Sequence, residues 1–198
     1  MQMNESGRRA TREAPPKKAS SRGAARPSGA GFLACRRGAA IVEFAFIAAP
    51  LFAILIAICQ IGVVFLAQQE LESAVEKSAR MLLTGEVQKG GLTPEQFKTK
   101  VCGGLTALFS CTQVMIDLQS ASAFSSVDTS APTLTYDSSG NVTNSWKFET
   151  GGVGSVLVLR VFYQIGVIGG PLGFNLANLA NGKRLLMATA VFQVEPYS

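Results

Sequence analysis

The chain has 198 residues, with 18 Lys and Arg against 13 Asp and Glu and no histidine, so it has room for one modest domain with appendages. Without histidine it lacks the commonest general base and any Ser-His triad, and it shows neither paired carboxylates at a useful spacing nor a metal-binding cluster. A Ser-Lys hydrolase needs no histidine, but no motif indicates one. We therefore expect a protein that is not an enzyme and has no catalytic residues, cofactor or metal site.

Half of the Lys and Arg residues precede Ala39. This leader, residues 1–38, is rich in Ala, Arg, Ser, Gly and Pro, and such a composition favours disorder because it cannot bury enough apolar surface. A basic tail can bind nucleic acid, and it can also be the cytoplasmic flank of a membrane helix. Because Arg36 and Arg37 directly precede a long apolar run, we favour the membrane flank and expect no nucleic-acid partner.

Residues 44–67 form an apolar run without one charge. As a helix this run is roughly 36 Å long, enough to cross a hydrocarbon core of about 30 Å. We expect a transmembrane helix over residues 39–67 in the lipid bilayer of a bacterial inner membrane, with the leader in the cytoplasm and residues 68–198 in the periplasm. Gln60 either faces a neighbouring helix or is a polar residue tolerated near the outer leaflet. A secretory signal is disfavoured because the run is too long and no small-x-small site follows it.

Glu43 stands at the entrance to this run, and the next charged residue is Glu70. A charged side chain at the centre of a span costs roughly 2.5–3.5 kcal/mol on insertion scales, so such a residue is presumed functional unless a partner neutralises it. Glu43 either pairs with Arg36 or Arg37 of its own chain or meets a partner on another subunit.

The sequence from Arg36 to Phe52, RRGAAIVEFAFIAAPLF, resembles the processing site of type IV prepilins, in which cleavage follows a Gly and a Glu stands at mature position five. Within that superfamily the chain looks like the TadE-like pseudopilins of tight-adherence (Flp) pilus systems. The closing Val194–Tyr197 is similar to endings in that group. The resemblance implies cleavage between Gly38 and Ala39 by a prepilin peptidase, which makes Glu43 the fifth residue.

Once the chain is cut, the ammonium group of Ala39 and the carboxylate of Glu43 can neutralise each other between neighbouring subunits. Because an unpaired buried charge is costly, only the correctly staggered neighbour is tolerated. The resemblance thus implies an assembly and register role for Glu43 and for Phe44, which stands where many major Flp pilins carry Tyr.

Major Flp pilins are barely longer than their helix, so residues 68–198 indicate a minor or accessory subunit. The resemblance implies four protein partners: the prepilin peptidase, a sister pseudopilin, the major Flp pilin and the pilus assembly platform. A leader of this length is long for a prepilin. The alternative is an unprocessed bitopic membrane protein with a periplasmic interaction domain, which differs from the first interpretation only at Gly38.

The helical pattern continues beyond residue 67, with an apolar stripe at three- and four-residue steps from Leu71 to Leu82 and Gly85 to end it. Thr93 and Gln96 predict a capping box at the start of a second helix. Outside the membrane we expect Cys102 and Cys111 to form a disulfide. We expect Cys35 and Cys59 to be free thiols.

Strand signals follow at residues 114–118, 133–136, 146–148, 156–163 and 185–194, with an Asp-Ser-Ser-Gly-Asn turn between the second and third. Such spacing predicts an antiparallel sheet packed on the long pilin-like helix, an α+β fold. The glycine-punctuated segment 165–173 lacks the spacing of a phosphate loop. We interpret it as a flexible apolar connection that can touch the membrane or a partner.

Overall fold

The computed structural model describes residues 36–170 and 173–196. The chain divides into two compact units, Met1–Ala45 and Phe46–Ser198, and each is described by itself. The disorder expected for the leader and the free thiol expected at Cys35 fall on residues 1–35, which lie outside the described residues.

The first unit is described from residue 36 onward and consists of the beginning of a long helix, α1 (Arg36–Leu83). We expected this helix to begin at Ala39. It begins earlier, so the basic pair Arg36 and Arg37 is already helical. All residues from Ala40 to Ala45 are exposed.

In the second unit, α1 has an exposed apolar part, followed by a part in which one face is buried. Among the described residues, α1 is the one helix long and apolar enough to cross a membrane, and its most apolar window is 0% buried. Further along, one face of α1 is buried, and the stripe predicted from the 3.6-residue period is confirmed. Its members are Leu71, Ala74, Val75, Ser78, Ala79 and Leu82.

The elements that follow α1 are α2 (Glu86–Lys89), α3 (Pro94–Cys102), the 3₁₀ helix η2 (Cys111–Gln113), β1 (Met115–Ala121), the 3₁₀ helix η3 (Phe124–Ser126), β2 (Val156–Gly166) and β3 (Lys183–Gln193). Gly85 follows the end of α1 in the left-handed conformation that glycine adopts readily, with φ 73°. The predicted capping box of α3 is present, because the Thr93 hydroxyl accepts from the Gln96 N–H and the Gln96 side chain accepts from the Thr93 N–H.

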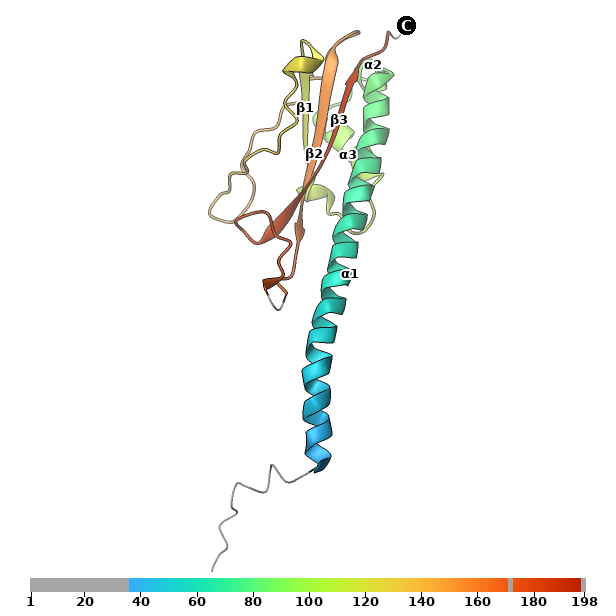
Figure 1. The fold of residues 1–198 in the computed structure, drawn as a ribbon. Coiled ribbons are helices and arrows are strands. Elements are labelled where there is room, and N and C mark those ends of the chain that lie inside the picture. Colours follow the sequence, from blue (N-terminus) through green and yellow to red (C-terminus); the bar gives the residue numbers. More distant parts are fainter. Residues whose placement is uncertain (1–35, 171–172, 197–198) are drawn as a thin grey trace, which may run out of the picture. The chain divides into compact units, whose positions relative to one another are not determined.

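The three strands form one antiparallel sheet in the order β1-β2-β3 (Figure 1). Each strand contributes buried side chains, such as Leu118, Leu159 and Leu186, to the same core as Leu71 of α1. Each of these four residues is 2% exposed or less. The predicted α+β fold, a long helix followed by a small antiparallel sheet, is confirmed.

The opposite face of the sheet is covered by the connection between β1 and β2, residues 122–155. The ring of Trp146 in this connection stacks on Phe162 of β2, with centroids 5.1 Å apart. As a result β2 is buried on both faces from Val156 to Gln164. A strand buried on both faces lacks polar alternation, which explains the continuous apolar character of this segment.

The strands expected at 133–136 and 146–148 are not regular strands, and this prediction was wrong. The structure has single bridges there, Tyr136 with Val142 and Leu118 with Phe148. The Asp-Ser-Ser-Gly-Asn turn between them is present, because the Asp137 N–H donates to the Asn141 carbonyl at 3.0 Å. The pairing at Phe148 does not extend into a ladder, because carboxylates bind the amides that it would use. The N–H of Lys147 donates to Asp117, and the N–H of Ser120 donates to Glu149.

The end of the described chain closes the domain. Val194 is 1% exposed, its N–H donates to the Ser155 carbonyl at 2.9 Å, and its carbonyl accepts from the Gly154 N–H at 3.0 Å. The next residue, Glu195, donates its N–H to the carbonyl of Leu83 at 3.1 Å, at the end of α1. Glu195 of the closing segment thus binds the terminus of the long helix.

Candidate processing and assembly site

The candidate cleavage site lies in the first turn of α1. The first four N–H groups of a helix have no partner within it, and positive charges near them oppose the helix macrodipole. The helix begins with Arg36 and Arg37 and has no acidic residue in its first turn. Gly38 in the same turn weakens a helix by about 1 kcal/mol relative to Ala. The Gly38–Ala39 peptide bond therefore lies in a turn that is easily unwound.

Glu43 follows one turn later, on the same side of the helix as Ala39 and Ala40. Its side chain is exposed, and so are its neighbours Val42 and Phe44, which are 54% and 69% exposed. No residue whose side chain the structure describes forms a hydrogen bond or ion pair with the Glu43 carboxylate. The alternative pairing with Arg36 or Arg37 lies outside the described side chains.

The helix beyond this motif presents apolar side chains to its surroundings on several sides. The large exposed ones between residues 46 and 66 are Phe46, Ile47, Leu51, Phe52, Ile54, Leu55, Ile56, Ile58, Ile61, Val63, Phe65 and Leu66. Monomeric soluble proteins rarely expose a contiguous apolar surface of this extent, so the helix requires lipid or other apolar helices around it.

This motif and the helix that follows it match a known family. Residues 38–80 match the model of the TadE-like proteins. The match begins at Gly38 and ends within the buried stripe of α1, so it covers less than a quarter of the chain. It confirms the TadE-like resemblance of this segment and associates the chain with membrane proteins of Tad pilus systems. Neither the curated proteins nor the solved structures contain a match to this chain.

The predicted disulfide between Cys102 and Cys111 is confirmed. It joins the end of α3 to η2, next to the start of β1. Cys59, in the apolar part of α1, is free and exposed, as predicted. The disulfide lies in the second unit, whereas the processing motif lies in the first.

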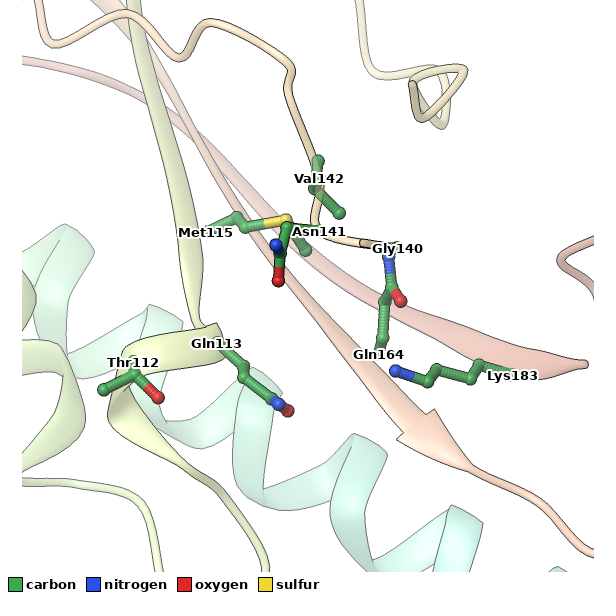
Figure 2. A pocket seen from close by; sticks show the side chains of 8 residues that line it. All are labelled: Thr112, Gln113, Met115, Gly140, Asn141, Val142, Gln164 and Lys183. Carbon is green, nitrogen blue, oxygen red and sulfur yellow. The ribbon is translucent and has the colours of Figure 1, made fainter. Parts of the chain in front are cut away.

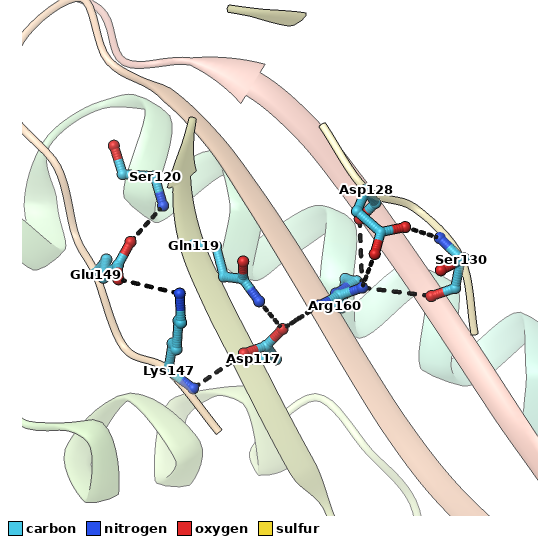
Figure 3. Close-up of polar contacts among 8 residues, drawn as sticks. All are labelled: Asp117, Gln119, Ser120, Asp128, Ser130, Lys147, Glu149 and Arg160. Carbon is cyan, nitrogen blue, oxygen red and sulfur yellow. Dashed lines mark hydrogen bonds and ion pairs between the residues drawn. The ribbon is translucent and has the colours of Figure 1, made fainter. Parts of the chain in front are cut away.

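Sequence reasoning missed a polar cluster on the outer face of the sheet (Figure 3). At its centre Arg160 of β2 donates to Asp117 of β1, and the two side chains are 10% and 3% exposed. Arg160 also donates to the carbonyls of Asp128 and Ser130, both at 3.3 Å. Hydrogen bonds from Ser130 hold the pKa of Asp128 below its ordinary value. The signal in the sequence was a charged residue inside each of two apolar strand segments.

A polar hollow of about 230 Å³ opens near the same face, at the other end of β1 (Figure 2). Gln164 and Lys183 line it together with Asn141 and Met115. Gln164 donates to the Tyr136 hydroxyl at 3.2 Å. The lining offers amides, a hydroxyl and an amine but neither a carboxylate nor an imidazole, so it can hydrogen bond a polar group and has no evident general base.

Proposed function

We propose that this chain is a minor, pseudopilin-like subunit of a tight-adherence (Flp) type IV pilus, anchored by α1 in a bacterial inner membrane. The observation that carries this proposal is the TadE-like match, which begins at Gly38 and runs along an exposed apolar helix. In this proposal residues 1–38 are a cytoplasmic leader, residues 39–67 cross the membrane, and residues 68–198 are exported. Its role is structural rather than catalytic, and its partners are the prepilin peptidase, a sister pseudopilin, the major pilin and the assembly platform.

Processing after Gly38 requires the peptidase to bind this bond in an extended conformation. The local physical chemistry supports that step, because the bond lies in the first turn of α1 beside two positive charges. Unwinding this turn breaks few hydrogen bonds. The buried stripe further along the helix is not disturbed.

Assembly then uses the new N-terminus. An ammonium group at the start of a helix opposes the macrodipole and requires a nearby carboxylate. Glu43 is the one acidic residue between Ala39 and Glu70. It is therefore the carboxylate that a neighbouring subunit can place beside the new N-terminus within the apolar part of the helix. The Ala39–Glu43 pair between subunits fixes the stagger of their helices.

The exported part is held together by the disulfide and by the sheet packed on α1. A disulfide persists in the oxidising periplasm, which supports the proposed orientation. The second candidate is an unprocessed bitopic protein with a periplasmic interaction domain. The observation that favours it is the helical conformation of Arg36–Ala39, since an uncut chain keeps that turn.

The deciding experiment measures intact mass and N-terminal sequence of the protein from membranes, with and without the prepilin peptidase. We expect a mature chain that begins at Ala39 only where the peptidase is present. Gly38→Leu should retain the leader, because the larger side chain is excluded at the cleavage site.

The matched control is Gly62→Leu, the same change in the same helix where no neighbouring atom lies within 4 Å of an added Cβ. This control should be processed normally. A full-length mass for the unchanged chain in both strains would instead establish the unprocessed bitopic protein.

A further inference from the structure

A groove lies where α1 leaves its apolar stretch and first packs on the sheet. It is a hollow of about 260 Å³ between Ile61, Val64 and Phe65 of α1 on one side and Leu176, Arg184 and Leu186 on the other. Ile61 and Phe65 are 48% and 62% exposed, so the groove is continuous with the apolar surface of the helix.

The position of the groove across the membrane follows from the sequence of α1. Residues 61–67 are the last part of the uncharged run, and Gln68 begins the polar part of the helix. If residues 39–67 cross the membrane as proposed above, the groove lies at the outer boundary between hydrocarbon and headgroups. The inference therefore rests on the proposed membrane crossing, but it does not depend on cleavage or on pilus assembly.

Arg184 is the one charged side chain of this groove, and its hydrogen bonding is incomplete. Its Nη1 donates to the Leu176 carbonyl at 3.1 Å, whereas its Nε is buried and has no partner. No carboxylate among the described residues forms an ion pair with it. A buried donor on a cation is costly unless an acceptor, best an anion, completes it.

The groove itself does not supply that acceptor. The amide of Gln68, which also lines it, donates to Glu72 at 2.7 Å and to the Met187 carbonyl at 3.0 Å, so Gln68 and Glu72 are held together on α1. One turn before Val64, the Nε2 of Gln60 is likewise buried without a partner. Two unsatisfied donors, Gln60 of α1 and Arg184 of β3, thus lie near the membrane end of the contact between the helix and the sheet.

The connection between β2 and β3 contributes Leu176 to this groove and is apolar in sequence. Residues 165–182 contain no charged side chain, and Lys183 and Arg184 follow at once. Ile168 in this connection is 72% exposed. An exposed apolar segment flanked by basic residues is typical of a membrane interface.

We propose that this groove binds one phospholipid of the outer leaflet. Part of an acyl chain packs against Ile61, Phe65 and Leu176, and the phosphate accepts hydrogen bonds from the guanidinium of Arg184, whose buried Nε has no partner within the chain. Arginine suits this task because its guanidinium presents several N–H donors to phosphate oxygens. A second copy of the chain fits less well, because its helix carries no anion at the same depth: residues 44–67 have no acidic residue.

The test uses the full-length chain purified in mild detergent and native mass spectrometry with two probes that share their acyl chains. Dioleoyl phosphatidylglycerol should form a one-to-one adduct, and dioleoylglycerol, which lacks the phosphate, should not. Arg184→Gln should weaken the adduct roughly tenfold or more, because it removes a charge-assisted hydrogen bond.

The matched control is Lys183→Gln, the same loss of charge one residue away, where the side chain lines the polar hollow on the other face of the sheet. This variant should bind the lipid as the unchanged chain does. The unfolding midpoint of Arg184→Gln is measured alongside. If that variant is destabilised, Arg184→Lys, which keeps the charge, is used in its place and should bind the lipid with intermediate affinity.

Equal adducts in Arg184→Gln and the unchanged chain would overturn the proposal. So would displacement of the lipid by soluble glycerol phosphate, which would indicate a phosphate site without a lipid. Loss of a dimer in Arg184→Gln with an unchanged lipid adduct would assign the groove to a second copy. The lipid adduct can also be measured on the uncleaved Gly38→Leu chain. A missing adduct there would refute the lipid site without bearing on the proposed pilus function.

Discussion

Asp117 of β1 and Arg160 of β2 are register partners, and two nitrogens of the guanidinium donate to a single carboxylate oxygen. Nε lies 3.1 Å and Nη2 2.6 Å from Oδ2 of Asp117. The other oxygen, Oδ1, accepts from the N–H of Lys147 at 2.9 Å. This pair therefore joins the two strands and also holds the covering connection on the outer face of the sheet.

Removing one member of the pair should destabilise the domain more than removing both. Asp117→Leu leaves the Arg160 charge buried and should lower the free energy of unfolding by about 3–5 kcal/mol. Asp117→Leu with Arg160→Met leaves no buried charge. The Lys147 N–H and the Gln119 amide lose their acceptor and the carbonyls of Asp128 and Ser130 lose a donor, at a cost of about 1–3 kcal/mol. Urea unfolding of the full chain in detergent, followed by fluorescence of the one tryptophan, Trp146, measures both. A double variant less stable than the single one contradicts this account.

The disulfide should contribute to stability through the short loop that it closes. Cys102 and Cys111 are 9 positions apart, and the loop stabilises by roughly 2–3 kcal/mol in the chain-entropy model. Changing both residues to Ala should lower the unfolding midpoint, and a reducing agent should have the same effect on the unchanged chain. Cys59→Ala is the control, since that thiol is free and exposed, and it should leave the midpoint unchanged.

The assembly role proposed for Glu43 is tested by Glu43→Ala. We expect normal membrane insertion and largely normal cleavage, but loss of pilus assembly or surface adherence, because the neighbouring ammonium group then lacks its carboxylate. Glu43→Gln, which keeps the shape and removes the charge, should behave in the same way. The control is Glu76→Ala, at an exposed position of the same helix. Normal piliation of both Glu43 variants would exclude the register role.

The turn at Asp137 should weaken in acid. Hydrogen bonds from Asn141, and from the Ser139 and Gly140 amides, hold the pKa of Asp137 below its ordinary value of about 3.9. A carboxyl whose pKa is depressed by folding contributes stability above its unfolded pKa, and this contribution is lost as pH falls through the folded pKa.

An NMR titration of the Ser139 and Asn141 amides should therefore show a midpoint below the ordinary value for aspartate. In Asp137→Asn the same transition should disappear. A midpoint at or above the ordinary value in the unchanged chain would show that these hydrogen bonds are weak in solution.

Local patterns in the sequence sufficed for the helical part of the fold. The stripe from Leu71 to Leu82 follows from a period of 3.6 residues, and the capping box at Thr93 follows from spacing alone. Both are fixed by neighbours within a few positions. The disulfide could be predicted because the other two cysteines lie in the leader and in the apolar run.

Local patterns could not predict the polar cluster, because Asp117 and Arg160 are 43 positions apart in the sequence and meet only through strand register. For the same reason the segments around Tyr136 and Phe148 were mistaken for strands. Their local alternation is that of a strand, but side chains occupy the amides that a ladder requires. Carboxylates do so beside Phe148, and the Asn144 side chain accepts from the N–H of Thr135, next to Tyr136. The unpartnered Nε of Arg184 likewise depends on packing that no local pattern encodes.

The bond between Glu195 and the end of α1 sets the order of events during biogenesis. The helix is synthesised first, and the strand that packs beside it and the segment that binds its terminus, residues 183–195, are made only after α2, α3, β1 and β2. In the proposed topology, the buried face of α1 lacks these partners until residues 183–195 have crossed the membrane. The domain therefore completes its folding only after translocation, and a chain that stalls in the translocon late in export exposes Leu71 and its neighbours to proteases and chaperones.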